Sequence, residues 1–189
     1  MPRSLKVFVS LIRGCYIVVR IVVDNMLGNL ARWLRVLGYD TEYSRKSQDA
    51  DILNLAIRDD RVIVTRDLGL HKRATKKNLK SVYIPPDLTE IADILALVAE
   101  KLGLNVEFDK GNTRCPLCNN KLSIVPKAQI ASFVPPEVLN KYDTFWYCGK
   151  CHKVYWQGNH WKTISDTLEM VKNKLNRKTG GISTSGPQA

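Results

Sequence analysis

The amino-acid sequence predicts an α/β domain with a mostly parallel sheet, followed by a small β-rich module that is held by four cysteines. Strand-like runs alternate with helix-like segments from Tyr16 to about Gly103, a pattern typical of βαβ crossovers and of a sheet covered by helices on both faces. After Gly111 the segments shorten and two CxxC pairs appear. The expected division is a leader, an α/β domain, the cysteine module and a helical or disordered basic tail, over residues 1–15, 16–111, 112–165 and 166–189.

The first half of the α/β domain alternates clearly. The run YIVVRIVV predicts a strand over residues 16–23, and apolar residues at helical spacing then predict a helix that ends at Gly38. A short strand is expected at residues 40–43. The helix that follows it carries the apolar residues Ile52, Leu53, Leu55, Ala56 and Ile57.

The second half of this domain continues the alternation. VIVT predicts a third strand, HKRATKKNLK a cationic helix and SVYI a fourth strand, over residues 62–65, 71–80 and 81–84. Pro85-Pro86 interrupts the chain, and residues 88–104 read as a long amphipathic helix that ends at Gly103. A sheet of this kind binds ligands beyond the carboxyl ends of its strands.

The charge of the chain favours a polyanionic partner. The 189 residues carry 29 Lys and Arg against 18 Asp and Glu, a formal net charge of +11, which suits nucleic acid or an acidic membrane surface. Arg13 and Arg20 interrupt the apolar N-terminal run, so it is too short to span a membrane. We therefore expect a cytoplasmic protein without a membrane segment, and a signal peptide is the alternative interpretation of this run.

Carboxylates follow the predicted strands in a way that suggests a metal site. Asp24 ends the first strand, Asp67 closely follows the third, and Asp49 and Asp51 begin the second helix. These side chains could converge on one pocket, where carboxylate oxygens would bind Mg²⁺ or Mn²⁺. Such ions activate water against a phosphodiester. The alternative is that each of these aspartates only caps a helix.

Basic residues near these carboxylates are candidates for phosphate contacts. They lie on the first helix, opposite its apolar stripe, and after the third strand, and they are Arg32, Arg35, Arg66, Lys72 and Arg73. A solvated helix face is the alternative for each of them.

The two CxxC pairs predict a four-thiolate metal site. Cys115 and Cys118 precede Cys148 and Cys151 by about thirty residues, a spacing typical of structural zinc. Iron in a rubredoxin-like site is the main alternative. His152 is expected to be a surface or packing residue, and nearby basic and aromatic side chains suit either an RNA-facing surface or the edge of a small core, namely Lys121, Lys127, Lys150, Lys153, Lys162, Trp156 and Trp161.

Three stretches carry a resemblance to a known family. DNMLGNLARWLRVLGYDTEY, DADILNLA and RVIVTRD, followed by the double-CxxC module, closely resemble the RNase domain found at the C-terminus of the mut-seven exonuclease. The resemblance covers about residues 16–165 and implies a PIN-like three-layer α/β/α domain with a C-terminal zinc ribbon. It also implies metal-dependent endoribonuclease activity, with Asp24, Asp49 (Asp51 nearby) and Asp67 as acidic residues. The fourth acidic residue usual in PIN nucleases has no clear match, and Asp87 and Asp93 are the only candidates.

The sequence therefore supports a metal-dependent endoribonuclease with RNA as its substrate. A non-catalytic module that binds RNA, a tRNA or the ribosome through the ribbon and the lysines is the alternative. A third interpretation makes the four cysteines an electron-transfer site.

Overall fold

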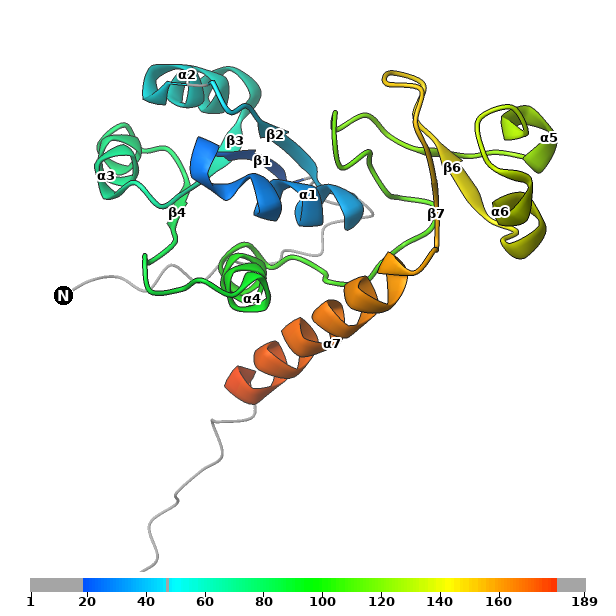
Figure 1. The fold of residues 1–189 in the computed structure, drawn as a ribbon. Coiled ribbons are helices and arrows are strands. Elements are labelled where there is room, and N and C mark those ends of the chain that lie inside the picture. Colours follow the sequence, from blue (N-terminus) through cyan, green and yellow to red (C-terminus); the bar gives the residue numbers. More distant parts are fainter. Residues whose placement is uncertain (1–18, 47, 180–189) are drawn as a thin grey trace, which may run out of the picture.

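The computed structural model describes residues 19–46 and 48–179, and Figure 1 shows their arrangement. Four parallel strands form one sheet in the order β2-β1-β3-β4, which confirms the α/β class. They are β1 (Arg20–Val23), β2 (Asp40–Tyr43), β3 (Arg61–Thr65) and β4 (Ser81–Tyr83). The expected leader with Cys15, the first residues of the expected strand at 16–18 and the tail from residue 180 lie outside the described residues.

Helices cover both faces of the sheet. α1 (Gly28–Val36) and α4 (Ile91–Leu102) lie on one face, and α2 (Asp49–Asp59) and α3 (Leu68–Lys76) lie on the other (Figure 1). Successive strand residues point to opposite faces, so Ile21 of β1 is buried with α1 and α4 whereas Val22 is buried with α2 and α3. The short 3-10 helix η1 (Asn25–Leu27) connects β1 to α1.

The cationic helix begins earlier than the sequence predicts. α3 starts at Leu68 rather than at residue 71, because the side chain of Asp67 accepts hydrogen bonds from the backbone of the first helical turn. Helix α4, by contrast, begins and ends inside the expected range 88–104.

The cysteine module is a small antiparallel ribbon, as expected. Its strands β5 (Ser123–Ile124), β6 (Phe145–Tyr147) and β7 (Val154–Trp156) are arranged in that order. Helices α5 (Lys127–Ile130) and α6 (Pro136–Lys141) lie between β5 and β6. This insertion packs against β6 in a small core around Ile130, Val134 and Phe145.

The last helix, α7 (His160–Thr179), returns from the ribbon and packs along α4 (Figure 1). Leu168 and Val171 are buried in the same apolar cluster as α4, and Lys174 pairs with Asp93 of α4 at 2.5 Å. None of the helices in the described ranges is both long enough and apolar enough to cross a membrane.

Candidate functional site

Two of the predicted carboxylates come together at the carboxyl edge of the sheet. β1 and β3 pair with Val23 opposite Val64, so the residues that follow in register, Asp24 and Thr65, are also neighbours. The Thr65 hydroxyl donates to Oδ2 of Asp24, and its oxygen accepts the backbone N–H of Asp67 at 2.9 Å. Thr65 therefore connects the two aspartates, and we call Asp24, Thr65 and Asp67 the acidic edge.

The carboxylate of Asp24 is buried and fully oriented. Its residue is only 4% exposed. Besides the Thr65 hydroxyl, the backbone N–H of Arg66 donates to Oδ2 at 3.0 Å and that of Met26 donates to Oδ1 at 2.7 Å. Such donors are what a buried carboxylate requires to keep its charge.

Asp67 caps α3 and still presents one oxygen. Its Oδ1 accepts the backbone N–H groups of Gly69 at 2.5 Å and Leu70 at 3.0 Å. No hydrogen bond to Oδ2 is found in the described part of the chain, and the residue is exposed. Capping, the alternative function expected for these aspartates, is thus observed for Asp67 and, at η1, for Asp24.

Asp49 pairs with a cation that lies close to the acidic edge. It begins α2, and its carboxylate pairs with the guanidinium of Arg73 on α3. A methyl group on Gly69 would lie 2.9 Å from Oδ1 of Asp67 and 3.3 Å from Nη1 of Arg73. Arg73 therefore pairs with Asp49, and Gly69 adjoins both this guanidinium and the carboxylate of Asp67.

Asp51 has a different place. It closes a capping box at the start of α2, where its Oδ2 accepts the backbone N–H of Gln48 at 2.9 Å. It lines a cavity of about 460 Å³ together with Glu42, Asn54 and Arg58, and Asp24, Asp49 and Asp67 do not line this cavity. The structure thus brings Asp51 to the flank of the sheet.

The acidic edge offers oxygen ligands but no closed carboxylate cage. Within the described ranges, the four cysteines are the only set of three or more potential metal ligands close enough together to share an ion. Mg²⁺ requires less than a cage, because it binds one or two carboxylates and keeps several waters. The donors present fit such an ion. Of the candidates for a fourth acid, Asp93 is paired with Lys174 and Asp87 lies in an exposed turn.

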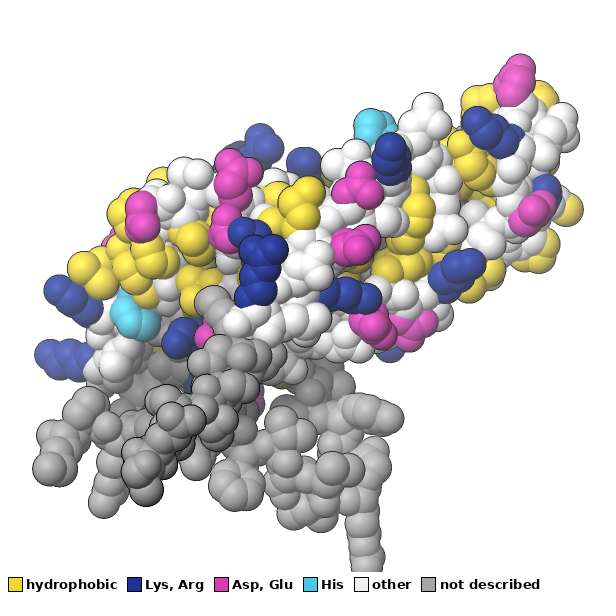
Figure 2. All heavy atoms as spheres, turned by 90° about the horizontal axis from the view of Figure 1, so that it is seen from below, with side chains coloured by type: hydrophobic (Ala, Val, Ile, Leu, Met, Phe, Trp, Pro, Cys, Tyr) yellow, Lys and Arg dark blue, Asp and Glu magenta, His cyan; other side chains and the backbone are white. Residues whose placement is uncertain are grey.

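The predicted cationic residues separate into three groups. Arg32 and Lys72 are exposed, whereas Arg73 pairs with Asp49. The guanidinium of Arg66 donates to the carbonyl of Leu88 at 2.6 Å, so it fixes the loop after β4. In Figure 2, lysine and arginine side chains on the face seen from below alternate with acidic ones instead of forming one basic patch.

Arg35 was expected to contact phosphate, with a solvated helix face as the alternative, but its side chain is buried instead. The residue is 3% exposed. Its guanidinium donates to the carbonyls of Thr41 at 2.8 Å, Pro116 at 3.0 Å and Leu117 at 3.1 Å. Burial lowers its pKa, an effect that the nearby carboxylate of Glu42 opposes. Arg35 therefore connects α1 to β2 and to the first CxxC pair through backbone carbonyls, which is a structural role rather than the expected phosphate contact.

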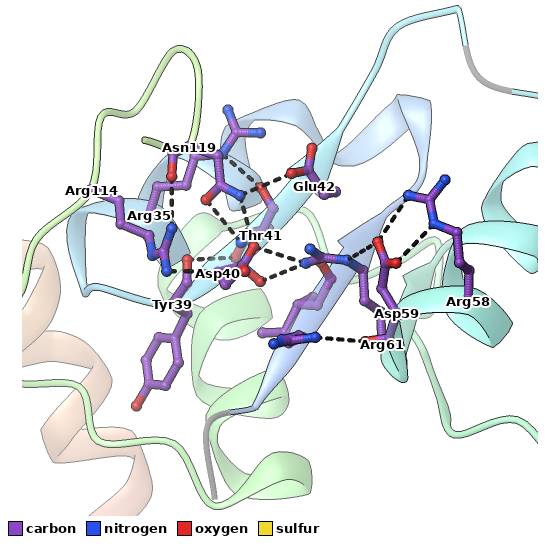
Figure 3. Close-up of polar contacts among 12 residues, drawn as sticks. Arg35, Tyr39, Asp40, Thr41, Glu42, Arg58, Asp59, Arg61, Arg114 and Asn119 are labelled. Atoms are coloured by element: carbon purple, nitrogen blue, oxygen red, sulfur yellow. Dashed lines mark hydrogen bonds and ion pairs between the residues drawn. The ribbon is translucent and has the colours of Figure 1, made fainter. Parts of the chain in front are cut away.

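Asn119 completes this connection between the ribbon and the sheet (Figure 3). It directly follows the first CxxC pair, and its Oδ1 accepts the backbone N–H of Thr41 at 3.0 Å. Its Nδ2 donates to Asp40 at 2.8 Å and to Glu42 at 3.2 Å. Because β2 is an edge strand, Asn119 satisfies a backbone group that would otherwise be unpaired. Neither Asn119 nor Thr65 is among the predicted site residues, although the position after a CxxC pair is recognisable in a sequence.

The four cysteines are placed to bind one metal ion. Their sulfur atoms all lie within 4.8 Å of one another, and all four are free thiols. The Sγ atoms of Cys115 and Cys151 are 3.6 Å apart and those of Cys118 and Cys148 are 3.4 Å apart. This is the arrangement that the two CxxC pairs predict, and it suits a tetrahedral site.

The thiols differ in their acidity without a metal. Burial raises the pKa of Cys151 to about 12. Burial also opposes the thiolate of Cys115, but the hydroxyl of Tyr155, at 3.1 Å, and backbone groups of the same turn outweigh it and hold the pKa at about 7. A bound cation would keep all four as thiolates, so metal binding must release protons.

The fold and the cysteine site agree with the family comparison. The model of the Mut7-C RNAse domain family matches residues 19–168. This range contains the whole sheet, the acidic edge and the ribbon, and the chain belongs to this family. Membership indicates a nuclease-like function. No curated protein and no solved structure matches the chain significantly.

Proposed function

We propose that this chain is a metal-dependent endoribonuclease whose active site is the acidic edge. The observation that carries the proposal is the buried carboxylate of Asp24 at the end of β1, oriented by three donors and connected through Thr65 to Asp67. A cap on a three-residue helix does not require a buried charge, whereas an active site requires a fixed one.

Mg²⁺ or Mn²⁺ is the cofactor that this donor set favours. Asp24 and Asp67 would hold the ion with waters, and Asp49 would join them if Arg73 released it. When bound, such an ion supplies an activated water and stabilises the charge that develops on the phosphodiester. Asp51 is included among the proposed acidic residues only because it lies in the first turn of α2, as Asp49 does.

The chain's own residues would orient this chemistry. Thr65 and the backbone of Arg66 hold Asp24 in one position. The exposed residues Arg32 and Lys72, with Arg73, are the proposed phosphate contacts, which position a nucleic acid without reading its sequence. Zinc is the ion that we propose for the four cysteines, with a structural role.

One observation favours the alternative of a non-catalytic RNA- or ribosome-binding protein. Asp24, Asp51 and Asp67 each accept hydrogen bonds from a helix terminus, so capping alone accounts for part of their placement.

The experiment that separates the two functions is a cleavage assay with the zinc-loaded full chain. Mixed-sequence RNA is incubated with the protein in the presence of Mn²⁺, Mg²⁺ or neither ion, and the products are sized. The proposal predicts internal cleavage that depends on the added ion. RNA that is bound but stays intact with both ions would establish the binding protein instead.

A further inference from the structure

The two cysteine turns of the ribbon have the same backbone. In the first turn (residues 115–120) the N–H of Asn119 donates to the carbonyl of Cys115 at 3.0 Å. In the second turn (residues 148–153) the N–H of His152 donates to the carbonyl of Cys148 at 2.8 Å. Asn119 and His152 both have positive φ, at 65° and 56°. They are therefore equivalent positions, each directly after the second cysteine of its pair.

The two turns differ in what they face. The first is docked, because Asn119 binds β2 and Arg35 binds the carbonyls of Pro116 and Leu117. The second turn is open, and Lys150, His152 and Lys153 are exposed on it. The side of the second turn that corresponds to the docked side of the first thus points to solvent.

Aromatic rings extend this open surface. The hydroxyl of Tyr147 and Nδ1 of His152 are 2.7 Å apart, and their ring centroids are 6.1 Å apart. The ring of Phe133, from the segment between α5 and α6, lies 6.3 Å from that of Tyr147. Phe133 is 59% exposed, although the next residue, Val134, is buried in the apolar core of the ribbon. Three neighbouring rings, with Phe133 and His152 at the two ends, therefore reach the surface of the ribbon.

The charge beside these rings is positive. Between Trp146 and Trp156 the chain carries Lys150 and Lys153 and no carboxylate. Among the described residues, neither lysine takes part in an ion pair, whereas Lys127 of the same ribbon pairs with Asp143. The surface thus combines exposed rings with two lysines that form no ion pair with a carboxylate of the described residues.

We propose that Phe133, Tyr147, His152, Lys150 and Lys153 form a binding surface for single-stranded RNA. Unpaired bases stack on aromatic rings, and the lysines neutralise the neighbouring phosphates. A duplex hides the faces of its bases and cannot use the rings in this way. The strands of the ribbon and the helices α5 and α6 lie on the side of the molecule away from α3 (Figure 1), so this surface is separate from the acidic edge. That the bound strand is also the substrate rests on the proposed function.

The test measures binding without cleavage. A fluorescent 12-nucleotide single-stranded RNA is titrated with the zinc-loaded full chain in buffer without Mn²⁺ or Mg²⁺, and anisotropy gives the affinity. Phe133→Ala removes one ring. His152→Asn removes another and keeps a residue that tolerates positive φ, as Asn119 does in the first turn. The double variant Lys150→Gln/Lys153→Gln removes the charges. Controls are Ile57→Ala, another exposed apolar residue, and Lys76→Gln/Lys77→Gln.

The proposal predicts a loss of about tenfold for each ring variant. The double lysine variant should bind more weakly and with a salt slope lower by about 1.4. The controls should stay within about twofold, and zinc content and melting temperature should not change. Equal losses in the controls, equal affinity for duplex RNA, or loss of zinc in the lysine variant would each overturn the proposal. If the ring variants weaken binding but the wild type does not cleave RNA with Mn²⁺, only the proposed function is contradicted. If the wild type cleaves RNA but the ring variants bind it as well as the wild type does, only this surface is contradicted.

Discussion

The hydroxyl of Thr65, at the end of β3, donates a hydrogen bond to the buried carboxylate of Asp24, at the end of β1. The same oxygen accepts the backbone N–H of Asp67. One side chain thus binds the carboxylate of Asp24 and the backbone of Asp67, which lies 43 residues further along the chain. The two aspartates meet because parallel strands end at the same edge of the sheet.

Thr65→Val tests this arrangement, because it keeps the shape of the side chain and removes the hydroxyl. Asp24 would lose a charge-assisted hydrogen bond, so we expect the free energy of unfolding to fall by about 2 kcal/mol and RNA cleavage to fall by about 10–100-fold. Urea unfolding and initial cleavage rates measure the two effects. Thr65→Ser, which keeps the hydroxyl, should retain cleavage, and equal activity of the two variants would show that the bond has no role.

Arg35→Met should destabilise the protein strongly. The three backbone carbonyls that Arg35 binds would lose their donor inside the structure, which costs about 3 kcal/mol or more. Arg32 on the same helix is exposed, so Arg32→Met should change stability by less than about 0.5 kcal/mol. Chemical denaturation compares the two variants. If both variants changed the free energy of unfolding only slightly, the first cysteine turn would not depend on Arg35.

Removal of the metal should unfold the ribbon. We expect one zinc ion per chain by elemental analysis, lost in Cys148→Ser but kept in Cys15→Ser. Loss of the ion leaves a small module without its main support, so a separate low-temperature unfolding step should appear for Cys148→Ser. A visible iron–thiolate spectrum in the protein as isolated would instead support the electron-transfer interpretation.

The contact between ribbon and sheet should depend on acid pH through Asp40. Burial opposes its ionisation, but hydrogen bonds from Arg61 and Asn119 outweigh it and lower the pKa below the ordinary 3.8. A pKa lowered by folding adds stability that is fully present above about pH 4 and is lost as the pH falls through the folded-state value. The stability difference between the wild type and Asp40→Asn should therefore shrink below pH 4. Asp60→Asn, at a surface residue, serves as the control, and a constant difference for Asp40→Asn would contradict the prediction.

Much of the sheet and its functional edge can be predicted from sequence. The apolar runs before Asp24 and Thr65 identify β1 and β3, and the rule for parallel sheets then brings their ends together. The cysteine site is equally direct, because the spacing of the two CxxC pairs indicates its geometry.

The docking of the ribbon could not be predicted in this way. Helical periodicity places Arg35 opposite the apolar stripe, which suggests solvent. Its partners, Pro116 and Leu117, lie far along the chain and offer only backbone carbonyls, which leave no signal in their side chains. The ion pair between Arg73 and Asp49 was not predicted for a similar reason, since it depends on how α2 and α3 lie on the sheet.

Asp67 gives the most direct test of the central claim, because its capping of α3 can be separated from its proposed binding of a metal ion. Asn caps helices about as well as Asp but brings no charge to a metal. We predict that Asp67→Asn folds with nearly the stability of the wild type, binds single-stranded RNA equally well and has lost Mn²⁺-dependent cleavage. Asp67→Ala should lose cleavage and, in addition, about 1 kcal/mol of stability. Cleavage by Asp67→Asn at the wild-type rate would contradict the assignment of the acidic edge as the active site.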